Sequence, residues 1–348
     1  MMKKIATMTF HWATNYGAVI QAYALQQYLL SIECQTEIIN YVPWSVSLQQ
    51  SINWRRNKQN EMFGKEKKLE EFRKRYLLRT EKIIRSKTLS KYSDEYSAII
   101  CGSDQIWNEA FTLKGEFKPT LAYYLNFAGK NTKRIAYAVS FGTIRTTEAY
   151  DNLVRNEIDK FSEISVRETT GQTIVNSYGL KAEVVCDPTL LLNKEDYLKL
   201  IKGTSIKTTK VFDYVLHGHT KTRKVADYII DQKNGSTIDY STDGIQEWLC
   251  RINEAEIVVT NSFHGVMLSL ILNRPFIAVL INGSGMNDRL ITILNEVGLE
   301  NRILYDFDEN IINAICTSTI DWDIVNEKLD TLRNKGKQFL KDAINECE

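Results

Sequence analysis

Residues 5–30 read IATMTFHWATNYGAVIQAYALQQYLL, and the fold is predicted outward from this stretch. Ile5–Phe10 is a short apolar run rich in strand-forming residues. A polar loop from His11 to Tyr16 follows it, and then Gly17. Beyond the glycine, apolar side chains recur at helical spacing as far as Leu30. A strand, a polar turn and a helix in this order predict the opening of a β/α unit.

The same alternation continues along the chain. The further elements expected in the first half are strands at 37–41, 97–101, 135–139 and 164–166, with a helix at 147–161. Those expected in the second half are strands at 211–217, 236–240, 255–259 and 276–280, separated by helical stretches. The fold class expected is therefore α/β, with two doubly wound Rossmann-like domains.

The pattern loosens around Cys186-Asp187-Pro188, where the proline restricts the residue before it to an extended backbone. We place the domain joint there, between a first domain at 1–186 and a second at 187–322. The remaining segment, 323–348, reads as a long helix, which we expect to pack back onto the first domain.

The composition is that of an ordinary globular protein, with 348 residues, 43% hydrophobic and 25% charged. A net charge of +1, from 44 Lys and Arg against 43 Asp and Glu, gives no reason to expect a nucleic-acid partner. The six Cys are scattered without a Cys-x-x-Cys pair, so no metal site is expected. No apolar stretch approaches the roughly 18 to 20 residues of a membrane span, and Ile5–Phe10 is too short for a signal peptide, so we expect a cytoplasmic protein.

The even charge balance conceals a basic segment. Residues 51–90 hold 13 Lys or Arg against 5 Asp or Glu, and Met62, Leu69, Phe72 and Tyr76 recur there at helical spacing. The segment reads as a basic amphipathic helical insert of the first domain. It is either a solvated helix face or a contact for an anionic lipid headgroup or a lipid-linked diphosphate, which would place the protein peripherally at the inner face of the membrane.

Ligands of doubly wound sheets bind beyond the carboxyl ends of the strands, so the turns there supply the candidate site residues. In the first turn these are Asn15, Tyr16 and Gly17, where the next helix offers unpaired amides to an anion. The alternative is that Asn15 caps the helix and Gly17 only packs.

A second turn, Gly102–Asn108, holds Ser103, Asp104, Gln105 and Trp107. Hydroxyl, carboxylate and amide groups beside an aromatic ring are suited to a sugar, and Asp104 is a candidate general base. The alternative is a helix cap next to a core tryptophan.

Arg167 follows the strand at 164–166 and is a candidate for holding a phosphate or carboxylate. A surface pair with Glu168 is the alternative.

The turn after the strand at 255–259 reads Thr260-Asn261-Ser262-Phe263-His264-Gly265, before a helix expected at 266–272. His264 is one of four His in the chain, and an imidazole there is suited to proton exchange near neutral pH. Ser262 and Phe263 are candidate binding residues beside it. A purely structural histidine is the alternative.

Two further loops of the second half contribute candidates. His217 and His219 flank Gly218, but no third ligand is near, so we keep His217 as a binding residue and do not read a zinc site. Asn287 and Arg289 belong to a polar loop whose spacing matches neither a P-loop nor a Rossmann fingerprint, which argues against an NTPase or a nicotinamide enzyme.

Six collinear motifs together resemble the polysaccharide pyruvyl transferase family. They are Asn15-Tyr16-Gly17-Ala18 with Gln21-Ala22-Tyr23-Ala24-Leu25, Gly102-Ser103-Asp104-Gln105-Ile106-Trp107-Asn108, Ala136-Tyr137-Ala138-Val139-Ser140-Phe141-Gly142, Ser165-Val166-Arg167-Glu168, Asp187-Pro188-Thr189-Leu190-Leu191 and Ser262-Phe263-His264-Gly265. The resemblance covers nearly the whole chain.

The resemblance implies a GT-B-like fold with the site in the interdomain cleft, the first domain on the acceptor side and the second on the donor side. It implies transfer of pyruvate from phosphoenolpyruvate to the hydroxyls of a lipid- or nucleotide-linked sugar, in the biosynthesis of a surface polysaccharide. The family's histidine falls on His264 and its arginine on Arg167. Some members carry another Arg where this chain has Ser262, so one contact to phosphoenolpyruvate is either missing here or supplied by another residue such as Arg289.

The substrates indicate the roles of the side chains. Ketal formation needs a proton on the methylene of the enol, a deprotonated sugar hydroxyl and loss of phosphate, so no redox cofactor is expected. His264 would be the acid or base, Arg167 and Arg289 would bind phosphate and carboxylate, and Asp104 would orient or deprotonate the acceptor. The other functions considered are a glycosyltransferase that uses a nucleotide sugar and a non-catalytic carbohydrate-binding protein.

Overall fold

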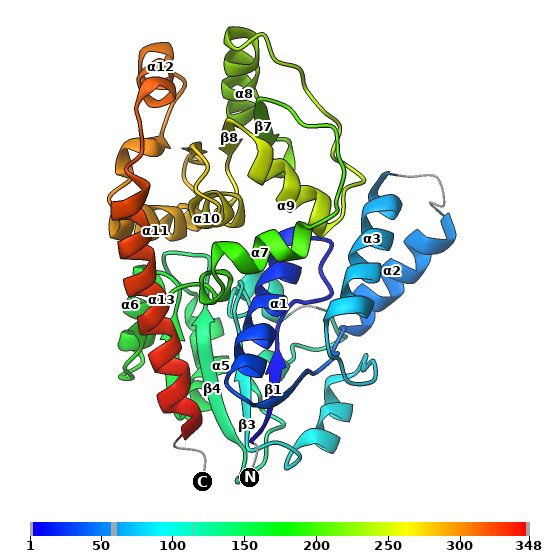
Figure 1. The fold of residues 1–348 in the computed structure, drawn as a ribbon. Coiled ribbons are helices and arrows are strands. Elements are labelled where there is room, and N and C mark those ends of the chain that lie inside the picture. Colours follow the sequence, from blue (N-terminus) through cyan, green and yellow to red (C-terminus); the bar gives the residue numbers. More distant parts are fainter. Residues whose placement is uncertain (1–2, 57–60, 114, 346–348) are drawn as a thin grey trace. The chain divides into compact units, whose positions relative to one another are not determined.

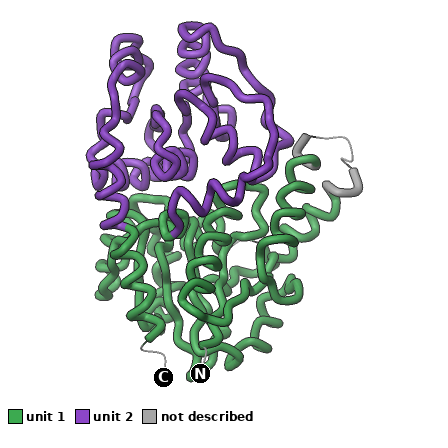
Figure 2. Tube along the Cα trace, in the orientation of Figure 1, with its two compact units in different colours: residues 1–191, 333–348 green, residues 192–332 purple. Residues whose placement is uncertain are grey.

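The computed structural model of the chain describes residues 3–56, 61–113 and 115–345. It divides into two compact units: unit 1, residues 1–191 and 333–348, and unit 2, residues 192–332 (Figure 2). The basic insert expected at 51–90 and the helix expected at 323–348 include residues 57–60 and 346–348, which lie outside the described residues.

Unit 1 is built on a six-stranded parallel sheet in the order β2-β1-β3-β4-β5-β6. Figure 1 labels β1, β3 and β4 of this sheet. The strands are β1 (Lys4–Met8), β2 (Gln35–Ile38), β3 (Ala98–Cys101), β4 (Lys133–Val139), β5 (Glu163–Val166) and β6 (Glu183–Val184). All four residues of β3 are buried, as expected for a strand that is covered on both faces. The order places the carboxyl ends of β1 and β3 side by side, with Met8 paired to Cys101.

The connections of unit 1 are mostly helical. They are α1 (Tyr16–Ser31), α2 (Trp44–Arg56), α3 (Glu61–Tyr76), η1 (Ser86–Tyr92), α4 (Glu109–Thr112), η2 (Ala122–Tyr124), α5 (Glu148–Ile158), α6 (Thr169–Ser177) and η3 (Pro188–Leu191). The helix expected at 147–161 is α5, which begins after Thr147 because that side chain accepts a hydrogen bond from the amide of Tyr150.

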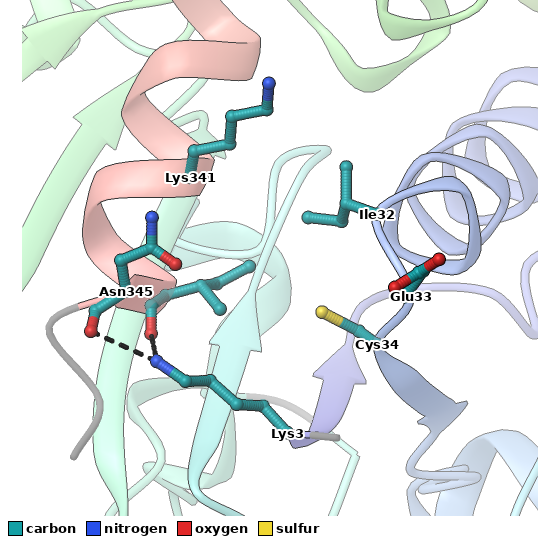
Figure 3. A pocket seen from close by; sticks show the side chains of 7 residues that line it. Lys3, Ile32, Glu33, Cys34, Lys341 and Asn345 are labelled. Carbon is teal, nitrogen blue, oxygen red and sulfur yellow. Dashed lines mark hydrogen bonds between the residues drawn. The ribbon is translucent and has the colours of Figure 1, made fainter. Parts of the chain in front are cut away.

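The last helix, α13 (Trp322–Asn345), contributes its residues from Arg333 onward to unit 1. The Nε of Arg333 donates to the carbonyl of Leu190 at 2.7 Å, which also ties the segment after the predicted joint to unit 1. At the far end of α13, the Nζ of Lys3 donates to the carbonyls of Ile344 and Asn345 at 2.8 and 3.0 Å (Figure 3). A cation there satisfies carbonyls that the helix leaves unpaired.

Unit 2 holds a four-stranded parallel sheet in the order β10-β9-β8-β7. Its strands are β7 (Val211–Tyr214), β8 (Ile257–Thr260), β9 (Phe276–Val279) and β10 (Ile303–Leu304). Its helical segments are α7 (Lys194–Ile201), η4 (Leu216–Gly218), α8 (Thr220–Gln232), α9 (Ile245–Glu254), α10 (Phe263–Ile271), η5 (Gly285–Asn287), α11 (Asp288–Val297), η6 (Glu300–Arg302), α12 (Glu309–Thr317) and the first part of α13.

The strand predicted at 236–240 is wrong, because the chain there is irregular. None of its five residues is buried, whereas every residue of β8 is. A segment without a buried face gains too little from joining a sheet whose strands are covered on both sides. Tyr240 instead packs its ring against Phe212, with 5.3 Å between the ring centroids.

Candidate functional site

The turn after β3 presents Asp104 at the carboxyl edge of the unit 1 sheet. Only glycine fits two positions before it, since a Cβ on Gly102 would lie 2.1 Å from the carbonyl oxygen of Tyr137. Asp104 has a left-handed backbone, with φ of 77°, and its side chain keeps 16% of its surface exposed. Its Oδ1 accepts from the amide of Gln105 at 2.9 Å. One carboxylate of the turn therefore remains accessible.

A buried ion-pair network lies behind Asp104. Nη1 of Arg167 donates to Oδ2 of Asp187 at 2.6 Å, and Nη2 lies 3.8 Å from Oδ1 of Asp104. Ser103 Oγ donates to the same Asp187 oxygen at 3.2 Å. Burial opposes the charged form of Arg167, but the carboxylates of Asp187, Asp104 and Glu168 outweigh it and raise its pKa. Arg167 is thus permanently cationic and positions Asp104.

This placement refines the expectation for Arg167, which is only 3% exposed and already paired with Asp187. Its guanidinium holds turns from three strands together, which is a scaffold role. Trp107 is wholly buried and stacks on Tyr124, with ring centroids 5.1 Å apart, so it belongs to the core and is not a surface for sugar.

The candidates of the first turn lie at the start of α1. Asn15 is its N-cap and accepts from the amide of Ala18 at 3.1 Å. Tyr16 and Gly17 are buried, and Nζ of Lys65 lies 3.9 Å from the centroid of the Tyr16 ring. Their contacts are those of a capped and covered helix start.

In unit 2 the turn after β8 is a helix start. Ser262 caps α10, which begins three residues earlier than predicted, and its Oγ accepts from the amide of Gly265 at 3.2 Å. A Cβ on Gly265 would lie 2.8 Å from Oγ1 of Thr260, so only glycine allows this close approach. His264 therefore lies in the first turn of α10, 6% exposed, with its ring 5.2 Å from that of Phe263.

Arg289, at the start of α11, joins the same group of residues. Its guanidinium carbon lies 5.5 Å from the centroid of the Phe263 ring. Asn287 holds the loop before it, since its Nδ2 donates to the carbonyl of Ile281 at 2.7 Å and its Oδ1 accepts from the same residue's amide at 3.1 Å. The structure thus brings Ser262, Phe263, His264 and Arg289 together.

His217 lies in the loop after β7, exposed, with a left-handed φ of 54°. The preceding residue, Leu216, is held by Asn261, whose Oδ1 accepts from its amide at 2.8 Å and whose Nδ2 donates to its carbonyl at 3.2 Å. Asn261 therefore connects the turn of His264 to the loop of His217.

Three positioning residues escaped the sequence reasoning: Asp187, Glu168 and Asn261. Each belongs to a quoted motif or turn, and a polar residue within three positions of the end of a strand was the available signal. Among the described residues, no group of three or more His, Cys, Asp or Glu could hold a metal ion. No helix in the described part of the chain is long and apolar enough to cross a membrane.

Two Rossmann-like units, each with polar turns at the carboxyl edge of a parallel sheet, define a GT-B-like α/β protein. The chain belongs to the polysaccharide pyruvyl transferase family, whose model matches residues 15–284, as the motifs predicted. The family indicates a transferase of polysaccharide biosynthesis.

A solved structure shows the same fold at low sequence identity. The UDP-N-acetylglucosamine 2-epimerase of Rickettsia bellii is similar over 98% of this chain and 97% of its own, with 11% identity and a TM-score of 0.52. The UDP-GlcNAc 2-epimerase of Methanocaldococcus jannaschii matches over 92% and 93%, with 12% identity and a TM-score of 0.48. No protein of curated function matches the chain.

Proposed function

We propose that this protein transfers the pyruvyl group of phosphoenolpyruvate to a pair of hydroxyls on a sugar, forming a cyclic ketal in a surface polysaccharide. The observation that carries the proposal is the grouping of His264 and Arg289 around Phe263 in unit 2. An imidazole for proton transfer and a guanidinium for an anion are the two groups that this donor requires.

The reaction balances without a redox step. The methylene carbon of phosphoenolpyruvate gains a proton, its C2 gains bonds to two sugar oxygens, and the C2–O bond to phosphate breaks. The hydroxyls release two protons, of which one ends on the new methyl group and the other leaves with phosphate. His264 transfers protons, and Arg289 binds the carboxylate or phosphate, because Ser262 stands where some members of the family carry an arginine.

Asp104 is the residue proposed to act on the acceptor from unit 1. Its side chain keeps an accessible carboxylate, and Arg167 behind it orients that carboxylate, with Nη2 3.8 Å from Oδ1. The acceptor is a sugar attached to a lipid diphosphate or to a nucleotide. For a lipid-linked acceptor, the exposed side chains of Lys74 and Arg75 on α3 would meet the anionic face of the membrane, with the protein on its cytoplasmic side.

The test is to incubate the protein with phosphoenolpyruvate and candidate acceptors, and to follow inorganic phosphate and the mass of the acceptor. Phosphate release with pyruvyl addition supports the proposal. Transfer that depends on a nucleotide sugar would make the protein a glycosyltransferase, and no transfer with either donor would leave a carbohydrate-binding protein.

Replacing the proposed acid–base group is the sharper variant. His264→Ala should lower turnover by at least about 100-fold, the range that general acid–base groups supply. Ser269→Ala is the matched control on α10, because its hydroxyl only donates to the carbonyl of Gly265, at 2.8 Å. Wild-type turnover in His264→Ala, with the control also active, would refute the role of His264.

A further inference from the structure

Two cavities meet at Trp12 in unit 1, and we call them the Trp12 cavities. Their volumes are about 560 and 410 Å³, and both are lined by Trp12 and Gln50. Each volume is in the roughly 300 to 1,000 Å³ range of small-molecule sites. The larger cavity is also lined by Glu66, Glu70, Arg73, Arg79 and Lys82, and the smaller by Thr14, Ser45, Val46 and Gln49.

The indole of Trp12 is held in place and is only partly buried. Its Nε1 donates to the hydroxyl of Tyr123 at 3.0 Å, and its ring lies 5.5 Å from that of Phe10. Its carbonyl accepts from Nε2 of Gln50 at 3.3 Å and from Nη2 of Arg73 at 3.2 Å. A ligand that stacks on this ring therefore meets an aromatic surface already ordered in the free protein.

The wall of the larger cavity consists of paired charges. Arg73 donates to Glu66 at 2.7 Å and Arg79 donates to Glu70 at 2.9 Å. Burial opposes ionisation of Glu70, but Arg79 and Arg73 outweigh it and lower its pKa. Two carboxylates offset two guanidinium groups, and Lys82 adds a single positive charge. Arg73 is only 1% exposed and its donors are taken by loop carbonyls and by Glu66. The groups left open to sugar hydroxyls are therefore Glu66, Glu70 and Arg79, which are 13, 29 and 16% exposed, together with Lys82, and they carry no strong net charge to attract an anion.

The loop that carries Trp12 begins beside the turn of Asp104, and buried hydrogen bonds join the starts of the two segments. Gln21 donates from Nε2 to Oγ1 of Thr9 at 2.9 Å, and its Oε1 accepts from the amide of Ser103 at 3.1 Å. Thr9 Oγ1 donates to the carbonyl of Ser103 at 2.8 Å. The loop of Trp12 and the turn of Asp104 thus start from adjacent strands, β1 and β3, that are locked to each other.

We propose that the Trp12 cavities bind a neutral oligosaccharide, with sugar rings against Trp12 and their hydroxyls on the paired charges. The inference deepens the proposed function: the acceptor is then a chain of several sugars, and the cavities hold the units next to the one that receives pyruvate. An aromatic face with convergent polar groups is the arrangement that a pyranose ring requires.

The test measures binding without phosphoenolpyruvate, so it does not depend on the transferase activity. Maltotriose, cellotriose and triacetylchitotriose are titrated into the full-length protein by calorimetry and by saturation-transfer NMR. We expect at least one to bind wild type, Trp12→Phe to retain binding, and Trp12→Ala to weaken it by about tenfold, the loss of one aromatic stack. Trp44→Ala is the matched control, because Trp44 packs on Phe117, with 4.8 Å between ring centroids, and does not line the cavities.

Two outcomes would overturn the inference. The first is a failure of the sugar site: none of the trisaccharides binds to wild type, or one binds with equal affinity to wild type and to Trp12→Ala. Thermal melting must show that both proteins are folded. The second is that inorganic pyrophosphate binds instead, and Lys82→Ala abolishes that binding, which would make the larger cavity an anion site. Sugar binding at Trp12 without any pyruvyl transfer would refute the proposed reaction and leave the inference standing.

Discussion

Removing the side chain of Arg73 should destabilise unit 1 far more than any exposed change on the same helix. Arg73 lies on α3 and only 1% of its side chain is exposed, although it belongs to the basic segment. Its guanidinium donates to the carbonyls of His11, Trp12 and Ala13 at 2.8, 3.2 and 2.7 Å. It also donates to Glu66 at 2.7 Å.

The magnitude follows from the groups that Arg73→Ala leaves behind. Three carbonyls of one loop and a carboxylate that is 13% exposed lose their donor together. Breaking a buried ion pair by removing one partner costs about 3 to 5 kcal/mol. Because Glu66 regains some water, we expect about 3 kcal/mol. Arg73→Lys keeps the charge but not the planar set of donors, so we expect a smaller loss, about 1 to 2 kcal/mol.

The assay is urea unfolding followed by far-UV circular dichroism. Lys74→Ala is the control, because it removes an exposed charge from the next position of α3 and should change stability by no more than about 0.5 kcal/mol. Equal unfolding midpoints for Arg73→Ala and Lys74→Ala would refute the reasoning. That result would mean that the loop from His11 to Ala13 is held by other contacts.

Three further predictions concern pH, the buried network and the basic surface. Burial outweighs the hydrogen bonds of His11 and lowers its pKa to about 4 in the folded protein, whereas the pKa in the unfolded chain is about 6.5. The unfolded chain therefore takes up the proton first as the pH falls, and about 2 kcal/mol of the folding stability present above about pH 6.5 should be lost by about pH 5. Urea unfolding above about pH 6.5 and at about pH 5 should show a larger loss of stability in wild type than in His11→Gln. Asp187→Ala should cost about 3 kcal/mol, because it leaves the guanidinium of Arg167 buried without its closest carboxylate, and Asp187→Asn should cost less; equal losses in urea titrations would contradict this. Neutralising Lys74 and Arg75 together should weaken binding to phosphatidylglycerol-containing vesicles, measured by sedimentation, by about 1 kcal/mol for each charge. The double variant should lose activity on a vesicle-borne acceptor and keep its activity on a soluble one. Equal loss of activity on both acceptors would mean that this helix face is only solvated.

The basic segment shows why charge counting alone misleads. Sequence assigns Arg73 and Arg75 to one basic helix, yet the first is buried against a loop and the second is exposed. The helical period of the sequence places Leu69 and Phe72 on a buried face, and both are buried. The sequence does not show which cation contacts the loop after β1, because that contact depends on where α3 packs.

The elements themselves were predictable where the local pattern was strong. The strands β1, β3, β8 and β9 and the helix α13 lie where the periodicity placed them, because apolar runs and helical spacing are properties of neighbouring residues. The edge strands β6 and β10 are two residues long, too short to show a period. The strand predicted at residues 236–240 is absent because apolar and polar residues alternate there but none of them is buried.

The two α/β units, the family and the turns that carry Asp104, Arg167 and His264 follow from local patterns in the chain. The contacts of those side chains follow from how the elements pack. Asp187 lies 84 positions from Ser103 in the chain, yet it bonds to Ser103 and pairs with Arg167, which becomes a buried support. Arg289 reaches Phe263 of α10 from α11, the next α-helix along the chain. The reason is physical: a period is written in consecutive residues, whereas a contact at the edge of a sheet depends on the order of its strands, which brings distant turns together.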